Sequence, residues 1–172
     1  MEDKSGNIWL GIYQKGVLLL PAKTNNFKYY GYKSTKNNII GSNNVISVHK
    51  DHEGTLWVGT DGDGIYGVGP CGEQRAHFTH STHSTVPSTI FSIYEDSFKN
   101  LWLGSYDRGL ARMNPKTGHC EYVNHVLDSN VKQVPRIFDL TEDNHQNLWI
   151  ATMGSGLYSM NLLNGDVTHY YA

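Results

Sequence analysis

The residues best suited to metal chemistry are the three histidines of the segment HFTHSTH, His77, His80 and His83. A zinc site needs three or four such ligands to converge on one point. His77 and His80 are an odd number of residues apart, so on a β-strand their side chains point to opposite faces. We therefore expect no metal here, and no cofactor elsewhere in the chain.

Other features of the sequence could indicate a calcium site, a disulfide or an enzyme. The segment DGDG, beginning at Asp61, resembles the start of a calcium-binding loop, but the downstream ligands and the final glutamate are missing, which favours a tight turn. Cys71 and Cys120 lack the spacing of a zinc site or of a disulfide framework, so both are predicted to be free thiols. The sequence contains no GxSxG nucleophile motif, no Cys/His pair and no phosphate-binding loop, so no enzyme is expected.

The elements that position these residues follow a repeat marked by tryptophan. The four tryptophans stand in GNIWLG, GTLWVG, KNLWLG and QNLWIA, at spacings of 48, 45 and 47 residues. Self-similarity at this period is typical of propellers, solenoids and arrays. The tryptophans are Trp9, Trp57, Trp102 and Trp149, and a glycine stands seven residues after each of them, at Gly16, Gly64, Gly109 and Gly156.

Each repeat predicts four short strands separated by turns. Runs such as VISVHK and NLWLGS are rich in β-branched and aromatic residues and end in Gly, Asn or Asp. We therefore predict an all-β fold of β-propeller blades, with the tryptophans packed between sheets and the glycines in turns. Residues 1–172 form one propeller segment, with blades at about 1–32, 44–80, 89–124 and 136–172, the first lacking its first strand.

The turns between the second and third strands are the predicted ligand site. In a propeller they lie on the same face as the connections between blades, near the central channel, where ligands usually bind. Aromatic, acidic and basic side chains there suit a polyhydroxyl or acidic sugar, while solvated turn residues remain an equal alternative. The candidates are Tyr13, Gln14, Lys15, Asp61, Asp63, Tyr106, Asp107, Arg108 and, in a blade connection, Arg136.

The other turns carry an aspartate six residues before each tryptophan. Asp51, Asp96 and Asp143 are the first residues of the turns DHEGT, DSFKN and DNHQN. A carboxylate at that point can accept hydrogen bonds from the backbone amides of the turn. These aspartates are therefore predicted to be structural.

Composition excludes several classes of partner. The net charge is −2 and no run of lysine or arginine occurs, so nucleic acid is not expected. The longest apolar run, VLLLPA, is far shorter than the roughly 20 residues that cross a bilayer, so no direct membrane insertion is expected. Met1 is followed by Glu2 and Asp3 rather than by basic residues, and no export signal is predicted.

The repeat resembles that of the two-component-regulator propeller family. The segments VHKDHEGTLWVGTDGDGIY, IYEDSFKNLWLGSYDRGLARMN and LTEDNHQNLWIATMGSGLYSMN carry the likeness, with Lys50 in place of the glutamate and Ala151 in place of a glycine. The resemblance implies a periplasmic sensor domain of a membrane-anchored hybrid two-component protein, of the kind found in gut Bacteroides, that detects oligosaccharides. A protein-interaction scaffold is the alternative, and a lyase-type propeller enzyme is less favoured.

An incomplete first blade leaves three arrangements open. The chain could be a four-bladed ring that lacks one strand, a piece of a longer propeller, or a partial ring completed by a second copy. Propellers close their rings, because closure protects the edges of the sheets. We favour the piece of a longer propeller, so the expected partners are the remaining blades of a receptor or, for the isolated chain, a second copy.

Overall fold

The computed structural model describes residues 1–22, 28–31, 39–41, 44–123 and 135–170. All regular elements within these residues are β-strands, so this part of the chain contains no helix that could cross a membrane. They form four antiparallel sheets, one with three strands and three with four. The predicted fold class is confirmed. The predicted blade boundaries at residues 32, 124 and 172 lie outside the described residues.

Each sheet is one blade, and its strands follow one another in chain order. Blade 1 contains β1 (Ile8–Ile12), β2 (Gly16–Leu20) and β3 (Lys28–Tyr30). Blade 2 contains β4 (Val45–Lys50), β5 (Leu56–Thr60), β6 (Ile65–Val68) and β7 (Gln74–Phe78). Blade 3 contains β8 (Ile90–Glu95), β9 (Leu101–Ser105), β10 (Leu110–Met113) and β11 (Cys120–Tyr122). Blade 4 contains β12 (Ile137–Glu142), β13 (Asn147–Thr152), β14 (Leu157–Asn161) and β15 (Val167–Tyr170).

The repeated glycine at the start of the third strand is required by its backbone. Gly64 has a φ of 69°, in the left-handed region that side chains disfavour. A Cβ at this position would lie 2.2 Å from the carbonyl oxygen of Phe78 on the neighbouring strand. Gly16 and Gly156 meet the same obstacle in blades 1 and 4. The glycine therefore lets the turn and the outer strand pack closely.

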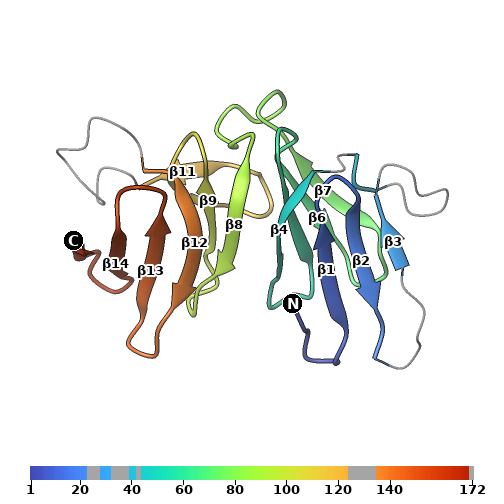
Figure 1. Cartoon of the computed structure of the whole chain (residues 1–172), viewed down its shortest axis with the longest axis horizontal. Helices are drawn as coiled ribbons and strands as arrows, with labels where there is room; N and C mark the ends of the chain where they lie inside the picture. The colour runs from blue at the N-terminus through green and yellow to red at the C-terminus, as the bar shows by residue number, and fades with distance from the viewer. Residues whose placement is uncertain (23–27, 32–38, 42–43, 124–134, 171–172) are drawn as a thin grey trace.

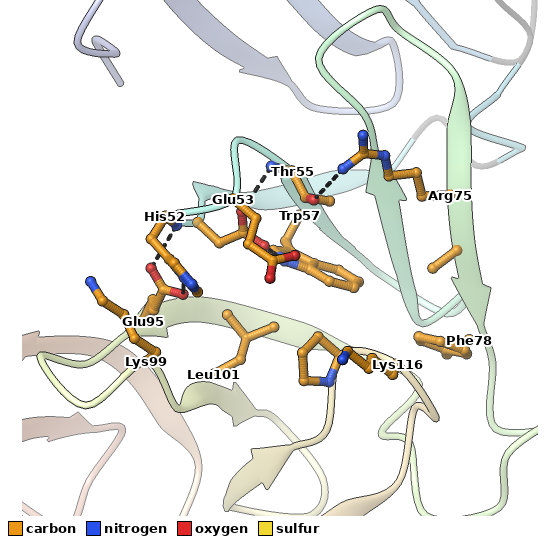
Figure 2. A pocket seen from close by; sticks show the side chains of 13 residues that line it. His52, Glu53, Thr55, Trp57, Arg75, Phe78, Glu95, Lys99, Leu101 and Lys116 are labelled. Atoms are coloured by element: carbon orange, nitrogen blue, oxygen red, sulfur yellow. Dashed lines mark hydrogen bonds and ion pairs between the residues drawn. The ribbon is translucent and has the colours of Figure 1, made fainter.

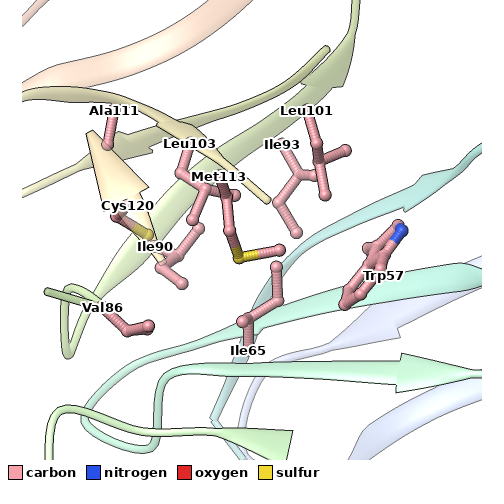
Figure 3. Packing of buried hydrophobic residues seen from close by; sticks show 10 residues of the cluster. All are labelled: Trp57, Ile65, Val86, Ile90, Ile93, Leu101, Leu103, Ala111, Met113 and Cys120. Carbon is pink, nitrogen blue, oxygen red and sulfur yellow. The ribbon is translucent and has the colours of Figure 1, made fainter. Parts of the chain in front are cut away.

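The four sheets stand side by side in chain order, with blade 1 and blade 4 at opposite ends of an open arc (Figure 1). Side chains from facing blades fill the space between them. Between blades 2 and 3, Trp57 and Ile65 pack against residues of blade 3 that include Leu101 and Met113 (Figure 3). Alternate residues of a strand point to opposite faces, so each blade supplies one set of side chains to each neighbour.

Candidate functional site

The turn after the first strand of each blade is organised by its aspartate. In blade 3, Asp96 accepts hydrogen bonds from the backbone amides of Phe98, at 2.9 Å, and Asn100, at 2.8 Å. Its second oxygen accepts a hydrogen bond from the indole Nε1 of Trp102 at 2.7 Å. Asp51 and Asp143 bind their turns and tryptophans in the same way. The role of these carboxylates is therefore structural, because their hydrogen bonds join the turn of each blade to its second strand.

The opposite ends of the sheets carry the predicted ligand site. Here the turns between second and third strands contact the connections between blades through backbone hydrogen bonds. The amide of Tyr106 donates to the carbonyl of Thr89 at 3.3 Å, and that of Met153 donates to Arg136 at 2.9 Å. We call this end of the sheets the connection face.

Four side chains from blades 3 and 4 gather on the connection face. The guanidinium carbon of Arg136 lies 4.5 Å from the centre of the Tyr106 ring, a cation–π contact. The Phe91 ring packs edge-on against Tyr106 at 5.6 Å and lies 6.1 Å from Phe138. We call Phe91, Tyr106, Arg136 and Phe138 the aromatic patch. Tyr106 is 40% exposed and Phe138 is 57% exposed, so these rings face solvent.

A β-bulge in each inner strand presents the phenylalanines. The register of β8 shifts between Ile90 and Ser92, and that of β12 shifts between Ile137 and Asp139, which leaves Phe91 and Phe138 as the extra residues. β4 has the same bulge. Bulges re-aim side chains and are frequent beside functional sites. In a strand without a bulge, the regular alternation of side chains between the two faces of the sheet would decide where the rings of Phe91 and Phe138 point.

Three of the four remaining predicted residues of blades 2 and 3 make contacts within the protein. Arg108 donates to the carbonyl of Ser84 at 3.0 Å and approaches His80 at 3.3 Å. Asp63 accepts a hydrogen bond from the hydroxyl of Tyr66. Asp61 accepts a hydrogen bond from Thr89 at 3.0 Å, which joins the turn of blade 2 to the next connection. Asp107 is exposed beside Arg108.

The three predicted residues of blade 1 lie at the far end of the arc from blade 4 (Figure 1). Tyr13, Gln14 and Lys15 are exposed in the β1–β2 turn, and Gln14 has a positive φ of 58°. The structure therefore brings Tyr106 and Arg136 together with two phenylalanines, while the blade 1 residues stand apart from them.

Phe91 and Phe138 are not among the ligand residues predicted from the sequence. The available signal was the pair Ile-Phe at the start of the inner strand in both IFSIYE and IFDLTE. An ordinary strand has one apolar face, and two consecutive apolar residues at its start indicate either burial on both sides or a bulge. The sequence alone does not separate these cases.

The clustered histidines have separate structural partners. The His77 ring stacks on Tyr66 with centroids 3.8 Å apart, and His83 packs edge-on against Phe78. His80 lies near the carbonyl of Val86 and near Arg108. Within the described residues, no group of three His, Cys, Asp or Glu side chains could hold a metal ion.

A groove between blades 2 and 3 is the second candidate surface (Figure 2). It has a volume of about 330 Å³, with Trp57, Leu101 and Phe78 among its apolar lining and Lys99 and Lys116 among its charged residues. None of the predicted ligand residues lines it.

Most charged groups of the groove already have protein partners. Glu95 accepts a hydrogen bond from the His52 amide at 2.8 Å and pairs with the His52 ring at 2.6 Å. Arg75 pairs with Glu73 at 2.9 Å and donates to Thr55. The Glu95–His52 contact joins blades 2 and 3, whereas the contacts of Arg75 lie within blade 2. Because these charged groups already have protein partners, the groove is a weaker candidate for ligand binding than the aromatic patch.

The strands, their order and their stacking define the protein as a set of β-propeller blades. Residues 39–62 and 86–107, in blades 2 and 3, match the family described as Two component regulator propeller, the family that the sequence motifs resemble. No curated protein sequence matches the chain.

Solved structures of similar fold include domains from Bacteroides and Porphyromonas. The extracellular domain of a hybrid two-component system of Bacteroides thetaiotaomicron aligns with 99% of the chain at a TM-score of 0.78 and 23% identity. The extracellular domain of a one-component system of the same organism aligns with all of it at 0.75 and 18% identity. PorZ, a surface component of the type-IX secretion system of Porphyromonas gingivalis, aligns at 0.52 and 15% identity over 33% of its own length.

The chain spans 22% and 24% of the lengths of the two Bacteroides domains. At these identities the likeness shows the fold, which different proteins use for different purposes.

Proposed function

We propose that this chain is a ligand-sensing module of a two-component signalling receptor and that it binds an oligosaccharide on the aromatic patch. The observation that carries the proposal is the exposure of Phe138, at 57%, beside Phe91 and Tyr106. Exposing a large aromatic ring on the inner strand of a sheet forgoes hydrophobic stabilisation. A binding role accounts for its position.

The chemistry of the patch suits a sugar. Aromatic rings offer flat apolar surfaces for the C–H faces of sugar rings, and a guanidinium donates several hydrogen bonds to hydroxyl or carboxylate oxygens. Arg136 is already oriented by the Tyr106 ring, so little side-chain entropy is lost when it binds. The proposed role is recognition without catalysis.

The rest of the receptor is also part of the proposal. The similar Bacteroides structures are extracellular domains about four times as long as this chain, which supports an extracytoplasmic location and further blades as partners. A membrane anchor and a signalling domain would belong to that larger receptor.

A glycan array of neutral and acidic oligosaccharides, followed by calorimetry on the best binder, tests the proposal. Phe138→Ala and Arg136→Ala should each weaken binding about tenfold or more, which corresponds to about 1.4 kcal/mol. Phe98→Ala is the matched control, because Phe98 is 46% exposed in the turn between β8 and β9, at the other end of the sheet. Absence of any glycan binding would favour a protein-interaction scaffold.

A further inference from the structure

Three of the four arginines in the chain pair with a carboxylate. The pairs are Arg75 with Glu73, Arg108 with Asp107 and Arg112 with Glu121, at N–O distances of 2.9, 4.0 and 2.8 Å. The fourth, Arg136, is exposed and has no carboxylate partner among the described residues, and its guanidinium contacts the Tyr106 ring instead. The aromatic patch therefore carries a positive charge that the described protein does not pair with an acid.

The fold depends on the backbone of Arg136 rather than on its side chain. In blades 2, 3 and 4, the carbonyl of the residue directly before the inner strand accepts a hydrogen bond from the turn between the second and third strands. The acceptors are Asn44, Thr89 and Arg136, and the donors are the amides of Asp61, Tyr106 and Met153, at 2.8, 3.3 and 2.9 Å. Because three different residues make this hydrogen bond, the position does not require an arginine.

The acidic residues next to the patch have other partners. Asp107, in the turn of blade 3, lies beside Arg108. Asp139, in β12, accepts a hydrogen bond from the amide of Leu140 at 2.9 Å. Neither carboxylate pairs with Arg136. An anion that reaches the patch would therefore meet a guanidinium that no neighbouring acid has neutralised.

Arg136 and Phe138 stand close enough to contact one sugar residue. Ile137, between them, is completely buried, whereas Arg136 and Phe138 are both exposed. Two steps along a backbone span at most about 7 Å. A sugar ring that stacks on Phe138 therefore lies within reach of the long Arg136 side chain.

The chemistry of the guanidinium favours a carboxylate on that sugar. The planar fork of an arginine matches the two oxygens of a carboxylate, and charge-assisted hydrogen bonds are roughly twice as strong as neutral ones. A uronic acid carries its carboxylate directly on a ring carbon, so the charge stays beside a stacked ring. The contact with Tyr106 already orients the guanidinium, which lowers the entropy cost of binding.

We propose that the oligosaccharide on the aromatic patch contains uronic acid, a specification that rests on the proposed function of this site. A uronic acid ring stacks on Phe138, and its carboxylate accepts hydrogen bonds from the guanidinium of Arg136. A neutral sugar can contact the same aromatic rings but leaves the charge of Arg136 unpaired. Arg136 is thus the residue that selects acidic over neutral sugars.

Calorimetry with matched pairs of oligosaccharides tests the proposal. The probes are oligosaccharides of galacturonic or glucuronic acid, each paired with the neutral chain obtained by reducing its carboxyl groups. For at least one pair, the acidic form should bind the wild type about tenfold more tightly or better, which corresponds to about 1.4 kcal/mol. Added salt should weaken binding of the acidic form and leave that of the neutral form nearly unchanged.

Three variants separate charge from stacking. Arg136→Gln keeps a hydrogen-bond donor but removes the charge, so it should abolish the preference for the acidic form. Phe138→Ala should weaken binding of both forms by a similar factor. Arg112→Gln is the matched control, because it makes the same change at an arginine of β10 that pairs with Glu121, and it should retain the wild-type preference. Thermal unfolding of Arg136→Gln should match the wild type, which shows that the variant is folded.

Two kinds of failure can be told apart. Binding with no preference for the acidic form, or a preference that survives Arg136→Gln, would overturn the assignment of uronic acid and leave the proposed function in place. Absence of binding to every oligosaccharide, acidic or neutral, would overturn the proposed function and the uronic acid assignment together.

Discussion

The carboxylate of Asp96 and the indole nitrogen of Trp102 lie 2.7 Å apart and form a hydrogen bond that ties the turn of blade 3 to its second strand. Asp96 is 2% exposed and Trp102 is 5% exposed. The pair recurs in every blade with the same six-residue separation. The tryptophan therefore serves two purposes, because its ring fills the interface to the next blade while its N–H satisfies a carboxylate.

Replacing the indole while keeping an aromatic ring should destabilise the fold. Trp102→Phe removes the donor to a buried carboxylate, and the expected loss in the free energy of unfolding is about 1–3 kcal/mol. Urea denaturation followed by circular dichroism measures it. Trp149→Phe is the matched control, and its loss should be smaller because Trp149 is only partly buried. Equal losses at both sites would contradict the explanation.

Acid should weaken the turn of blade 4. Hydrogen bonds from the Asn147 side chain and amide and from the Trp149 indole hold the pKa of Asp143 well below its usual range. A carboxyl whose pKa is lowered in the folded state contributes stability above its unfolded pKa of about 4 and loses that contribution as the pH falls further. Thermal unfolding from pH 5 to pH 2.5 should show a smaller change in melting temperature for Asp143→Asn than for the wild type. Identical pH dependence would exclude Asp143 as a contributor.

The sequence was sufficient to predict the blades because each repeat encodes its strands locally. Trp57 and Gly64 mark a strand and a turn through their own spacing and backbone preferences. The aromatic patch was harder to predict from the sequence. Phe91 and Phe138 reach solvent because of β-bulges, and a β-bulge depends on how two strands pair rather than on the alternation of polar and apolar residues along one strand. The contacts that Arg108 and Asp63 make within the protein could not be predicted from the sequence for a similar reason. Their partners lie in loops and strands whose proximity only the fold determines.

Replacing one turn residue should increase the stability of the protein. Gln146 has a φ of 62° at a position where blades 1 and 2 have Gly6 and Gly54, with φ values of 77° and 81°. Gln146→Gly relieves the left-handed strain and should raise the free energy of unfolding by about 0.5–1 kcal/mol, after allowing for the flexibility of glycine in the unfolded chain. Gly54→Ala is the reverse change and should be destabilising. Urea denaturation of both variants checks the prediction, and a stabilising Gly54→Ala would refute it.

The two thiols should differ sharply in reactivity. Cys71 is exposed, whereas Cys120 is buried between blades 2 and 3, where burial raises the pKa of its thiol to about 12. Thiolate is the reactive form, so at pH 8 a disulfide reagent such as DTNB should modify one thiol per native chain and two in denaturant. Cys71→Ser should abolish the native reaction. Modification of both thiols in the native protein would show that the packing between blades 2 and 3 opens readily.

Chemical-shift mapping of the isotope-labelled chain with its best-binding oligosaccharide tests the location of the proposed site most directly. The largest shifts should occur on the connection face, at Phe91, Tyr106, Arg136 and Phe138. Shifts centred instead on Trp57 and Lys99 would place the ligand in the groove between blades 2 and 3 and would contradict the assignment of the aromatic patch.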